Sequence, residues 1–289
     1  MGNKQKQINQ NQKQNQIDEK KEFIQANLNE GTILKIEIDK SVQSLKPFQV
    51  TKKVSQTLLR YENNPLQELD LYFPLFINIS KIDDLKLSKT QQQDLKKVYL
   101  NLELNKIGFQ EIAILLNNFF QFTLNLETVK IILSNVPIGN RGLISLSEKL
   151  AQQSSLKYLF LDLLSSCIGN QGLTQLINSL ANLQNLEFLN LGIWYNYVDR
   201  QGIIYFFECL AKFKRLRFVI TKIKCIDNYM SIGQRIQMPK SLVYLDIQIQ
   251  KQRYDQIEFK VDKIQNIKKS FRLVNLKIKH MYDDQQYYI

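Results

Sequence analysis

Apolar and polar positions repeat with a period of 30 residues through the middle of the chain. Three units begin at Leu126, Leu156 and Leu186, and each opens with alternating apolar and polar residues. Such alternation is typical of a strand with one buried face. The second half of each unit instead carries apolar residues three and four apart, which indicates an amphipathic helix. Each unit therefore predicts one strand and one helix, stacked on its neighbours as in a solenoid.

A glycine-containing turn separates the two halves of the first two units. The sequence Ile-Gly-x-x-Gly occupies positions 138–142 and 168–172. Glycine suits a turn in which φ is positive or in which two stretches of backbone approach closely. We expect the chain to change direction at these turns, from strand to helix.

Together these features resemble the leucine-rich repeat, in its long ribonuclease-inhibitor-like class. The spacing L-x-x-L-x-L-x-L at Leu156, Leu159, Leu161 and Leu163 carries the resemblance, with the glycine turn and the helix that follow it. The resemblance implies an α/β solenoid in the form of a horseshoe. Parallel strands would line its concave face and helices would lie outside.

One position of the repeat departs from the family pattern in some of the units. In the family, the residue two before the isoleucine or valine of the turn is usually Asn. In successive units of this chain it is Asn105, Val136, Ser166 and Asn196. Because a valine side chain cannot pair with backbone groups, we expect the ladder of capping side chains to be incomplete.

Weaker versions of the pattern extend the stack in both directions. Further strand openings lie at Ile33, Leu66, Leu95, Leu216, Leu242 and Leu273, which gives about nine strands in all. We divide the chain into four regions. They are an Asn/Gln/Lys-rich tail expected to be disordered (1–17), degenerate N-terminal repeats and cap (18–94), regular repeats (95–215), and irregular C-terminal repeats and cap (216–289).

Several helices are expected between and before the strands. The pattern is weakly helical from Asp18 to Leu28, and clearer over Thr51 to Arg60 and Glu111 to Phe119. A last helix face is expected between Ile257 and Ile267. The segment 84–87 is also compatible with an additional extended piece.

The composition favours a protein of the cell interior. The cysteines Cys167, Cys209 and Cys225 are odd in number and have no metal-binding spacing. Together with the lack of a signal peptide, they favour a reducing compartment, and we expect the cytoplasm. No stretch approaches the ~18 apolar residues that a membrane span needs. Acylation of Gly2 would give reversible membrane attachment, but Lys6 replaces the usual Ser or Thr, so we do not favour it.

The sequence offers little support for an enzyme. The only histidine is His280, near the C-terminus. A metal site with several histidines is therefore excluded, and a catalytic triad that includes histidine would have to use His280. Phosphate-binding glycine motifs are absent from the sequence, and the carboxylates are scattered by the repeat pattern. We expect no catalytic residue, no metal and no cofactor.

The repeat pattern also predicts which side chains project from the concave face. The leucines of each strand point inward, so the third and fifth positions project toward solvent. These positions, with the residue two past Gly192, place aromatic side chains at Tyr158, Phe160, Phe188, Trp194, Phe218 and Tyr244. We predict an exposed patch that binds a partner. Two alternatives stay open: rings that stack only to stabilise the sheet, and a register shifted by one, which would bury them.

Charge changes along the same face. The chain has a formal net charge of +12. The first strands project the mainly acidic set Lys35, Glu37, Asp39, Glu68 and Asp70, and the last ones project Lys222, Lys224, Lys277 and Lys279. A basic end would steer an acidic protein surface, RNA or an anionic membrane toward it.

We therefore predict a non-catalytic protein-protein interaction module, or scaffold, that binds its partner through the concave face. The alternative is a basic nucleic-acid-binding or ribonucleoprotein scaffold subunit. A third hypothesis is a small-GTPase regulator, which would need a suitably placed side chain such as Arg141 or Arg200. The repeat framework itself does not identify the partner.

Overall fold

The computed structural model describes residues 24–29, 32–39, 47–73, 82–123, 125–224, 238–251 and 275–282. The predicted disordered tail, Gly2, Cys225 and the helix predicted around 257–267 lie outside these ranges.

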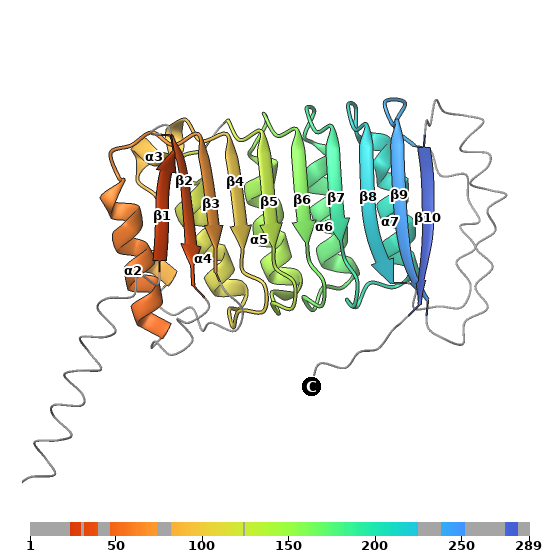
Figure 1. The fold of residues 1–289 in the computed structure, drawn as a ribbon. Helices are drawn as coiled ribbons and strands as arrows, with labels where there is room; N and C mark the ends of the chain where they lie inside the picture. The colour runs from red at the N-terminus through yellow and green to blue at the C-terminus, as the bar shows by residue number, and fades with distance from the viewer. Residues whose placement is uncertain are drawn as a thin grey trace, which may run out of the picture.

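Within the described residues, ten strands form one sheet in which the spatial order follows the chain (Figure 1). The strands are β1 (Ile24–Asn29), β2 (Ile33–Ile38), β3 (Glu68–Tyr72), β4 (Lys97–Asn101), β5 (Thr128–Ile132), β6 (Tyr158–Asp162), β7 (Phe188–Gly192), β8 (Phe218–Lys224), β9 (Tyr244–Lys251) and β10 (Asn275–Tyr282). The nine predicted strands are β2 to β10, and they pair in parallel from one end to the other. The tenth, β1, was not predicted.

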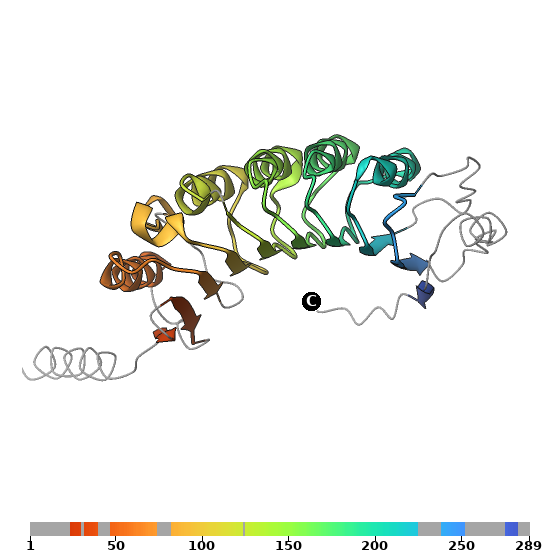
Figure 2. The same ribbon diagram turned by 90° about the horizontal axis from the view of Figure 1, so that it is seen from above.

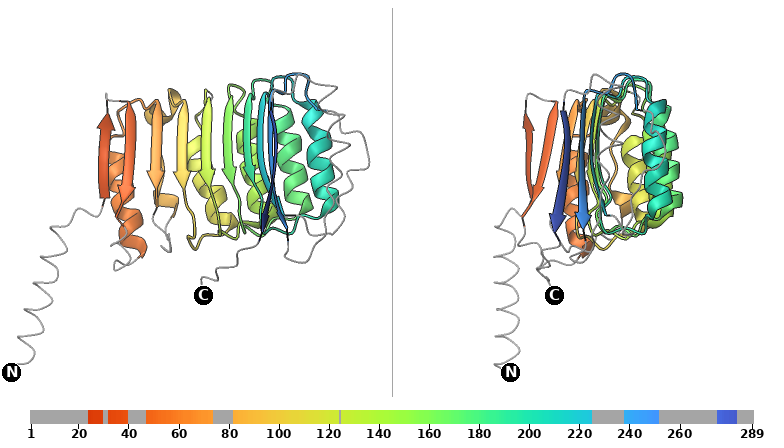
Figure 3. Two further views of the ribbon diagram at one scale, coloured as in Figure 1. Left: turned by 45° about the vertical axis from the view of Figure 1, so that its right-hand side comes forward. Right: turned by 90° about the vertical axis from the view of Figure 1, so that its right-hand side faces the viewer.

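The helices lie on one side of this sheet. They are α2 (Pro47–Arg60), α3 (Lys89–Gln93), α4 (Phe109–Phe120), α5 (Gly139–Ala151), α6 (Asn170–Ala181) and α7 (Arg200–Cys209), with short 3-10 turns η2 (Ile82–Asp84) and η3 (Leu210–Lys212). Figure 2 shows them on the outer side of a curved stack, with the strands on the inner side, and Figure 3 shows the two layers from the end. The fold is thus an α/β solenoid-like stack. In the part of the chain that is described, no helix is long and apolar enough to cross a membrane.

The core lies between the sheet and the helices, and the repeat pattern accounts for it. The leucines of each strand are buried, as at Leu159 and Leu161, and so are the helix residues Leu173, Leu176 and Leu180. Because every strand from β4 to β8 meets the next without offset, equivalent leucines of successive repeats stack into continuous layers.

The weak helix predicted from Asp18 to Leu28 is wrong where the structure describes the chain. Residues Ile24–Asn29 form β1, which pairs antiparallel with β2 at the end of the sheet. Ile24, Ala26 and Leu28 pack against the edge of the core, while the residues between them are exposed. The period of two, supported by pairing with β2, outweighs a weak helical tendency.

The repeat that begins at Leu66 is degenerate, as predicted, but contains no strand at 84–87. Asp84 ends η2, and the short helix α3 follows after residues without regular structure. A capping box fixes the start of α3: Gln91 N donates to Ser88 Oγ at 3.1 Å, and Ser88 N donates to Gln91 Oε1 at 2.8 Å.

The ladder of capping side chains is incomplete, as predicted. Asn196 Oδ1 accepts hydrogen bonds from the Ser166 and Ile168 N–H groups, at 3.0 and 2.9 Å, and so joins two repeats. At the equivalent position of the preceding repeat, Ser166 Oγ donates a hydrogen bond of 2.8 Å to the carbonyl of Leu133. At Val136 the ladder is interrupted, because this side chain has no polar atom.

Two further asparagines, Asn140 and Asn170, each bond the turn of the following repeat. Asn140 Oδ1 accepts hydrogen bonds from Gly169 N at 2.8 Å and Gly172 N at 3.1 Å. A Cβ atom at Gly172 would lie 2.7 Å from the same Oδ1, which is closer than any normal contact. The second glycine of the turn is therefore required by the asparagine beside it. Gly139 supplies the other expected property, a φ of +60°.

Candidate partner-binding surface

The inner face, which is the face of the sheet opposite the helices, carries three rows of side chains. The strand register aligns them across the stack. The first row is Glu68, Lys97, Thr128, Tyr158, Phe188, Phe218 and Tyr244. The middle row is Lys35, Asp70, Tyr99, Lys130, Phe160, Asn190, Ile220 and Asp246. The third row is Glu37, Tyr72, Asn101, Ile132, Asp162, Gly192 and Lys222. The predicted strand register is therefore confirmed.

Aromatic side chains occupy the first row on four consecutive strands, and we call Tyr158, Phe188, Phe218 and Tyr244 the aromatic row. The ring centroids of Phe188 and Phe218 lie 6.2 Å apart, and those of Phe218 and Tyr244 lie 6.3 Å apart. Phe160, in the middle row, contacts Phe188 with a centroid distance of 4.7 Å. The rings thus stack across the strands, as one of the alternatives proposed.

Stacking does not bury these rings. Tyr158 is 42% exposed, and Phe160, Phe188, Phe218 and Tyr244 are each partly exposed. The alternative of a shifted register, with the rings in the core, is excluded. The aromatic row therefore offers apolar surface on the inner face while it also stabilises the sheet.

Two cations lie over rings at the same end of the inner face. The guanidinium carbon of Arg217 is 5.7 Å from the centre of the Phe218 ring, and Lys222 Nζ is 5.6 Å from that of Trp194. Trp194 itself lies just past the end of β7 and is partly exposed. The predicted basic surface is described only at Lys222. Lys224, Lys277 and Lys279 are in β8 and β10, but their side chains lie outside the described part of the structure.

Asp246 closes the middle row at β9, and the sequence did not indicate its burial. Only 6% of the residue is exposed, and the hydroxyl of Tyr244 donates to Asp246 Oδ2 at 3.2 Å. Burial raises the pKa of the Tyr244 hydroxyl, and the neighbouring Asp246 carboxylate raises it further. Asp246 thus holds the last ring of the aromatic row by its polar end.

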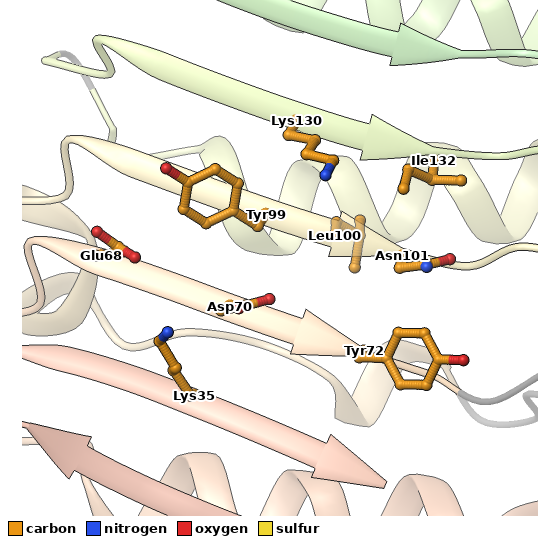
Figure 4. Close-up of a pocket in the computed structure, with 9 residues that line it drawn as sticks. All are labelled: Lys35, Glu68, Asp70, Tyr72, Tyr99, Leu100, Asn101, Lys130 and Ile132. Carbon is orange, nitrogen blue, oxygen red and sulfur yellow. The ribbon is translucent and has the colours of Figure 1, made fainter. Parts of the chain in front are cut away.

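The other half of the inner face contains a depression of about 450 Å³, which we call the inner-face depression (Figure 4). It spans β2 to β5 and is lined by Lys35, Glu68, Asp70, Tyr72, Tyr99, Leu100, Asn101, Lys130 and Ile132. The sequence indicated a charged end of the inner face here but did not indicate the depression. The alignment of the strands does place Asp70 between Lys35 and Tyr99 in the middle row, and this group of charged and aromatic side chains is the feature of the sequence that points to the depression.

Burial and charge both act on the groups of the inner-face depression. Partial burial raises the pKa of the Asp70 carboxyl, and the Lys35 ammonium group opposes this effect. Burial also raises the pKa of the Tyr99 hydroxyl, with a further contribution from Glu68. Glu68 is itself engaged by Lys97, whose Nζ lies 3.2 Å from Glu68 Oε2.

Charges alternate in sign along the edge where the strands begin. We call Lys96, Glu127, Lys157, Glu187 and Arg217 the charge ladder, one residue for each successive repeat. The backbone of each is linked to the next, as in the 2.9 Å hydrogen bond from Lys157 N to Glu127 O. Lys157 Nζ also lies 2.9 Å from Glu127 Oε2, and this contact lowers the pKa of the Glu127 carboxyl.

The residues of the other hypotheses lie apart from these surfaces. Arg141, in the first turn of α5, has its guanidinium carbon 5.6 Å from the centre of the Phe109 ring, and Arg200 begins α7. His280 is in β10, the predicted terminal strand, but its side chain is not described. Among the described residues no group of three potential metal ligands is present, and Cys167 and Cys209 are free thiols.

No protein-family model matches this chain, and no curated protein matches it.

Proposed function

We propose that the protein is a non-catalytic leucine-rich-repeat module that binds another protein through the inner face of its sheet. One observation carries the proposal: the aromatic row presents partly exposed rings on four consecutive strands. Exposed apolar surface of this kind marks interaction sites. Aromatic side chains also supply most of the binding energy at protein interfaces.

The repeat geometry supports the family part of this proposal. Units of 30 residues each give one parallel strand and one outer helix, and Asn196 links repeats at the position where the family carries its asparagine. The stack is curved with the strands on the inner side, which supports the proposal of a horseshoe (Figure 2). The free thiols Cys167 and Cys209 fit the cytoplasm, the reducing compartment that we propose for the protein.

The charges around the aromatic row favour a protein partner over a nucleic acid. A single strand of nucleic acid needs a continuous basic track for its phosphates. On the described inner face, however, Lys222 shares its row with the partly exposed carboxylate of Asp162. Such mixed polarity around an aromatic centre is typical of a protein interface.

The test is affinity capture from cells with a variant that removes three rings of the row: Tyr158→Ala, Phe188→Ala and Phe218→Ala. The matched control is Leu59→Ala with Phe122→Ala, which removes exposed apolar side chains from other parts of the surface. Circular dichroism checks that both variants are folded. We expect the wild type and the control to recover one protein that the row variant loses.

Binding of the purified partner then gives the magnitude. Loss of the aromatic row should weaken it at least about thirtyfold, the effect of losing about 2 kcal/mol at a single hot-spot side chain. Unchanged recovery by the folded row variant would show that the row only stabilises the sheet. Recovery dominated by nucleic acid, and abolished by nuclease, would instead support the ribonucleoprotein scaffold.

A further inference from the structure

Three charged groups of the inner-face depression make neither a hydrogen bond nor an ion pair with the described residues. They are Asp70 on β3, Lys35 on β2 and Lys130 on β5. Glu68, which also lines the depression, is held by Lys97 at 3.2 Å. The groups available to a ligand are therefore one carboxylate and two ammonium groups.

Asp70 is the group most in need of a partner. Its carboxylate is partly buried, and desolvation is the largest influence on its pKa, which is raised. A partly buried charge without hydrogen bonds is unfavourable, so a ligand that donates to Asp70 recovers some of this cost. Figure 4 shows the tyrosines Tyr99 and Tyr72 on either side of Asp70, within the same hollow.

These surroundings favour arginine as the donor. The planar guanidinium group can bond both oxygens of a carboxylate and can stack on aromatic rings. Rings at Tyr72 and Tyr99 are available for such stacking, and they lie on the strand of Asp70 and on the next strand.

A ligand with charge of one sign does not suit the depression. A lone cation would bond Asp70 but would also meet Lys35 on one side and Lys130 on the other (Figure 4). A lone anion would bond Lys130 but would meet Asp70, with Glu68 and Glu37 near it. Only a ligand that brings both signs can bond Asp70 and the ammonium group of Lys130 at the same time.

We propose that the inner-face depression binds a segment of the protein partner in which an arginine and an acidic side chain lie two residues apart. The arginine bonds Asp70 between Tyr72 and Tyr99, and the acidic side chain bonds Lys130. This inference builds on the proposed function, because it assigns a charge pattern to the partner.

The spacing of the strands fits this arrangement. Asp70 and Lys130 belong to the same row on strands separated by two steps, a distance of about 10 Å. Residues two apart in an extended segment lie about 7 Å from each other on one side of the chain. The long, flexible side chains of arginine and glutamate cover the difference.

The experiment titrates three short peptides into the nitrogen-15-labelled full chain and follows the backbone amide signals by NMR. The peptides are acetyl-Arg-Gly-Glu-amide, acetyl-Arg-Gly-Gln-amide and acetyl-Gln-Gly-Glu-amide. We expect saturable shifts at Tyr99 and Asn101, which line the depression, with the first peptide binding about tenfold more tightly than either of the others.

Two variants that each remove one charge assign the contacts. Asp70→Asn should weaken the two arginine peptides about tenfold and should not weaken acetyl-Gln-Gly-Glu-amide, which loses only a repulsion. Lys130→Gln should weaken the two glutamate peptides and spare acetyl-Arg-Gly-Gln-amide. Lys52→Gln, at an exposed lysine of α2, is the control for a general effect of charge and should change none of the affinities.

Each remaining outcome would overturn the proposal. Absence of saturable shifts at the depression excludes a binding site there. Equal weakening of peptide binding by all three variants would show that the peptides respond only to the overall charge of the protein. The same titration on the Tyr158→Ala, Phe188→Ala, Phe218→Ala variant separates the two proposals. Peptide binding should persist in this variant, because the aromatic row lies on β6 to β9, outside the depression. The experiment can therefore contradict the proposed role of the aromatic row without contradicting the proposed role of the depression, and the reverse.

Discussion

At the scale of single residues, the turns from strand to helix depend on side chains contributed by the preceding repeat. Asn140 bonds the backbone of Gly169 and Gly172, and Asn170 Oδ1 accepts a hydrogen bond of 3.0 Å from Asp199 N in the next turn. The close approach of Asn140 leaves no room for a Cβ atom at Gly172. The glycine and the asparagine therefore function as a pair.

Gly172→Ala should destabilise the protein by about 1–3 kcal/mol, the usual effect of overpacking a site that cannot expand. Urea unfolding measures the change. The double variant Asn140→Ala/Gly172→Ala removes the obstructing oxygen and should be more stable than the sum of the two single effects predicts. Strict additivity would show that the two residues do not interact.

Asp70 is expected to make stability depend on pH. Its folded-state pKa is raised above the ordinary value of 3.8, so the folded chain holds this proton to higher pH than the unfolded chain does. Its contribution is therefore most favourable at low pH and is lost as pH rises through the folded-state pKa.

Asp70→Asn should accordingly be more stable than the wild type near pH 7, by a few tenths of a kcal/mol because solvent screens a partly exposed group. Its advantage should shrink as the pH falls toward 4. Thermal unfolding of both proteins across this range gives the difference. A variant that gains stability relative to the wild type on acidification would reverse the expected sign.

At the scale of elements, the incomplete ladder of capping side chains makes successive turns unequal in strength. Asn196 bonds the N–H groups of Ser166 and Ile168, and its Nδ2 donates to the carbonyl of Leu163 at 2.6 Å. The Ser166 side chain forms one hydrogen bond to the preceding repeat. The repeat interface at Asn196 therefore depends on its side chain more than the interface at Ser166 does.

Asn196→Ala should cost about 2–4 kcal/mol, because it leaves buried backbone groups unpaired, whereas Ser166→Ala should cost about 1 kcal/mol. Urea unfolding compares the two variants. Hydrogen exchange should also become faster at the Ser166 and Ile168 amides in the first variant. Similar losses in both variants would mean that water replaces the asparagine.

The elements show where the sequence was sufficient. The strands β2 to β10 and the helices α2 and α4 to α7 follow from apolar spacing, because each repeat must bury one face against its neighbours. The strand β1 was missed because its alternation extends over only six residues, within a segment that also has weak helical spacing, and pairing with β2 decides between the two structures.

The candidate site was predicted only in part, for a related reason. The aromatic row follows from register, which leucine spacing determines. The inner-face depression depends on how far Asp70 and Tyr99 are buried and on the engagement of Glu68 by Lys97, and neither is encoded in a local pattern. Three-dimensional packing was needed to find it.

At the scale of the whole molecule, the described repeats form a one-dimensional stack, in which the main contacts of each repeat are with the repeats beside it. The sheet follows chain order, and neighbouring helices pack in the same order. A destabilising substitution in one repeat should therefore affect that repeat and its immediate neighbours more than distant repeats.

Leu161→Ala, at a fully packed position of β6, should cost about 2–5 kcal/mol and should speed amide hydrogen exchange in β5, β6 and β7. The protection of β2 and β3 should change little. Mass spectrometry of exchanged peptides resolves these segments. An equal loss of protection in all strands would mean that the stack unfolds as a single cooperative unit.

The charge ladder divides the repeats into two alternating kinds, positive and negative. Because its signs alternate, every repeat from Lys96 to Arg217 has neighbours of opposite charge, and even and odd repeats are not interchangeable. Loss of one unit, such as 126–155, would place Lys96 beside Lys157, two like charges on adjacent strands, which is unfavourable. Loss of two units, 126–185, would place Lys96 beside Glu187 and preserve the alternation. By this measure, the smallest length that can be added or removed without an electrostatic fault is a pair of repeats.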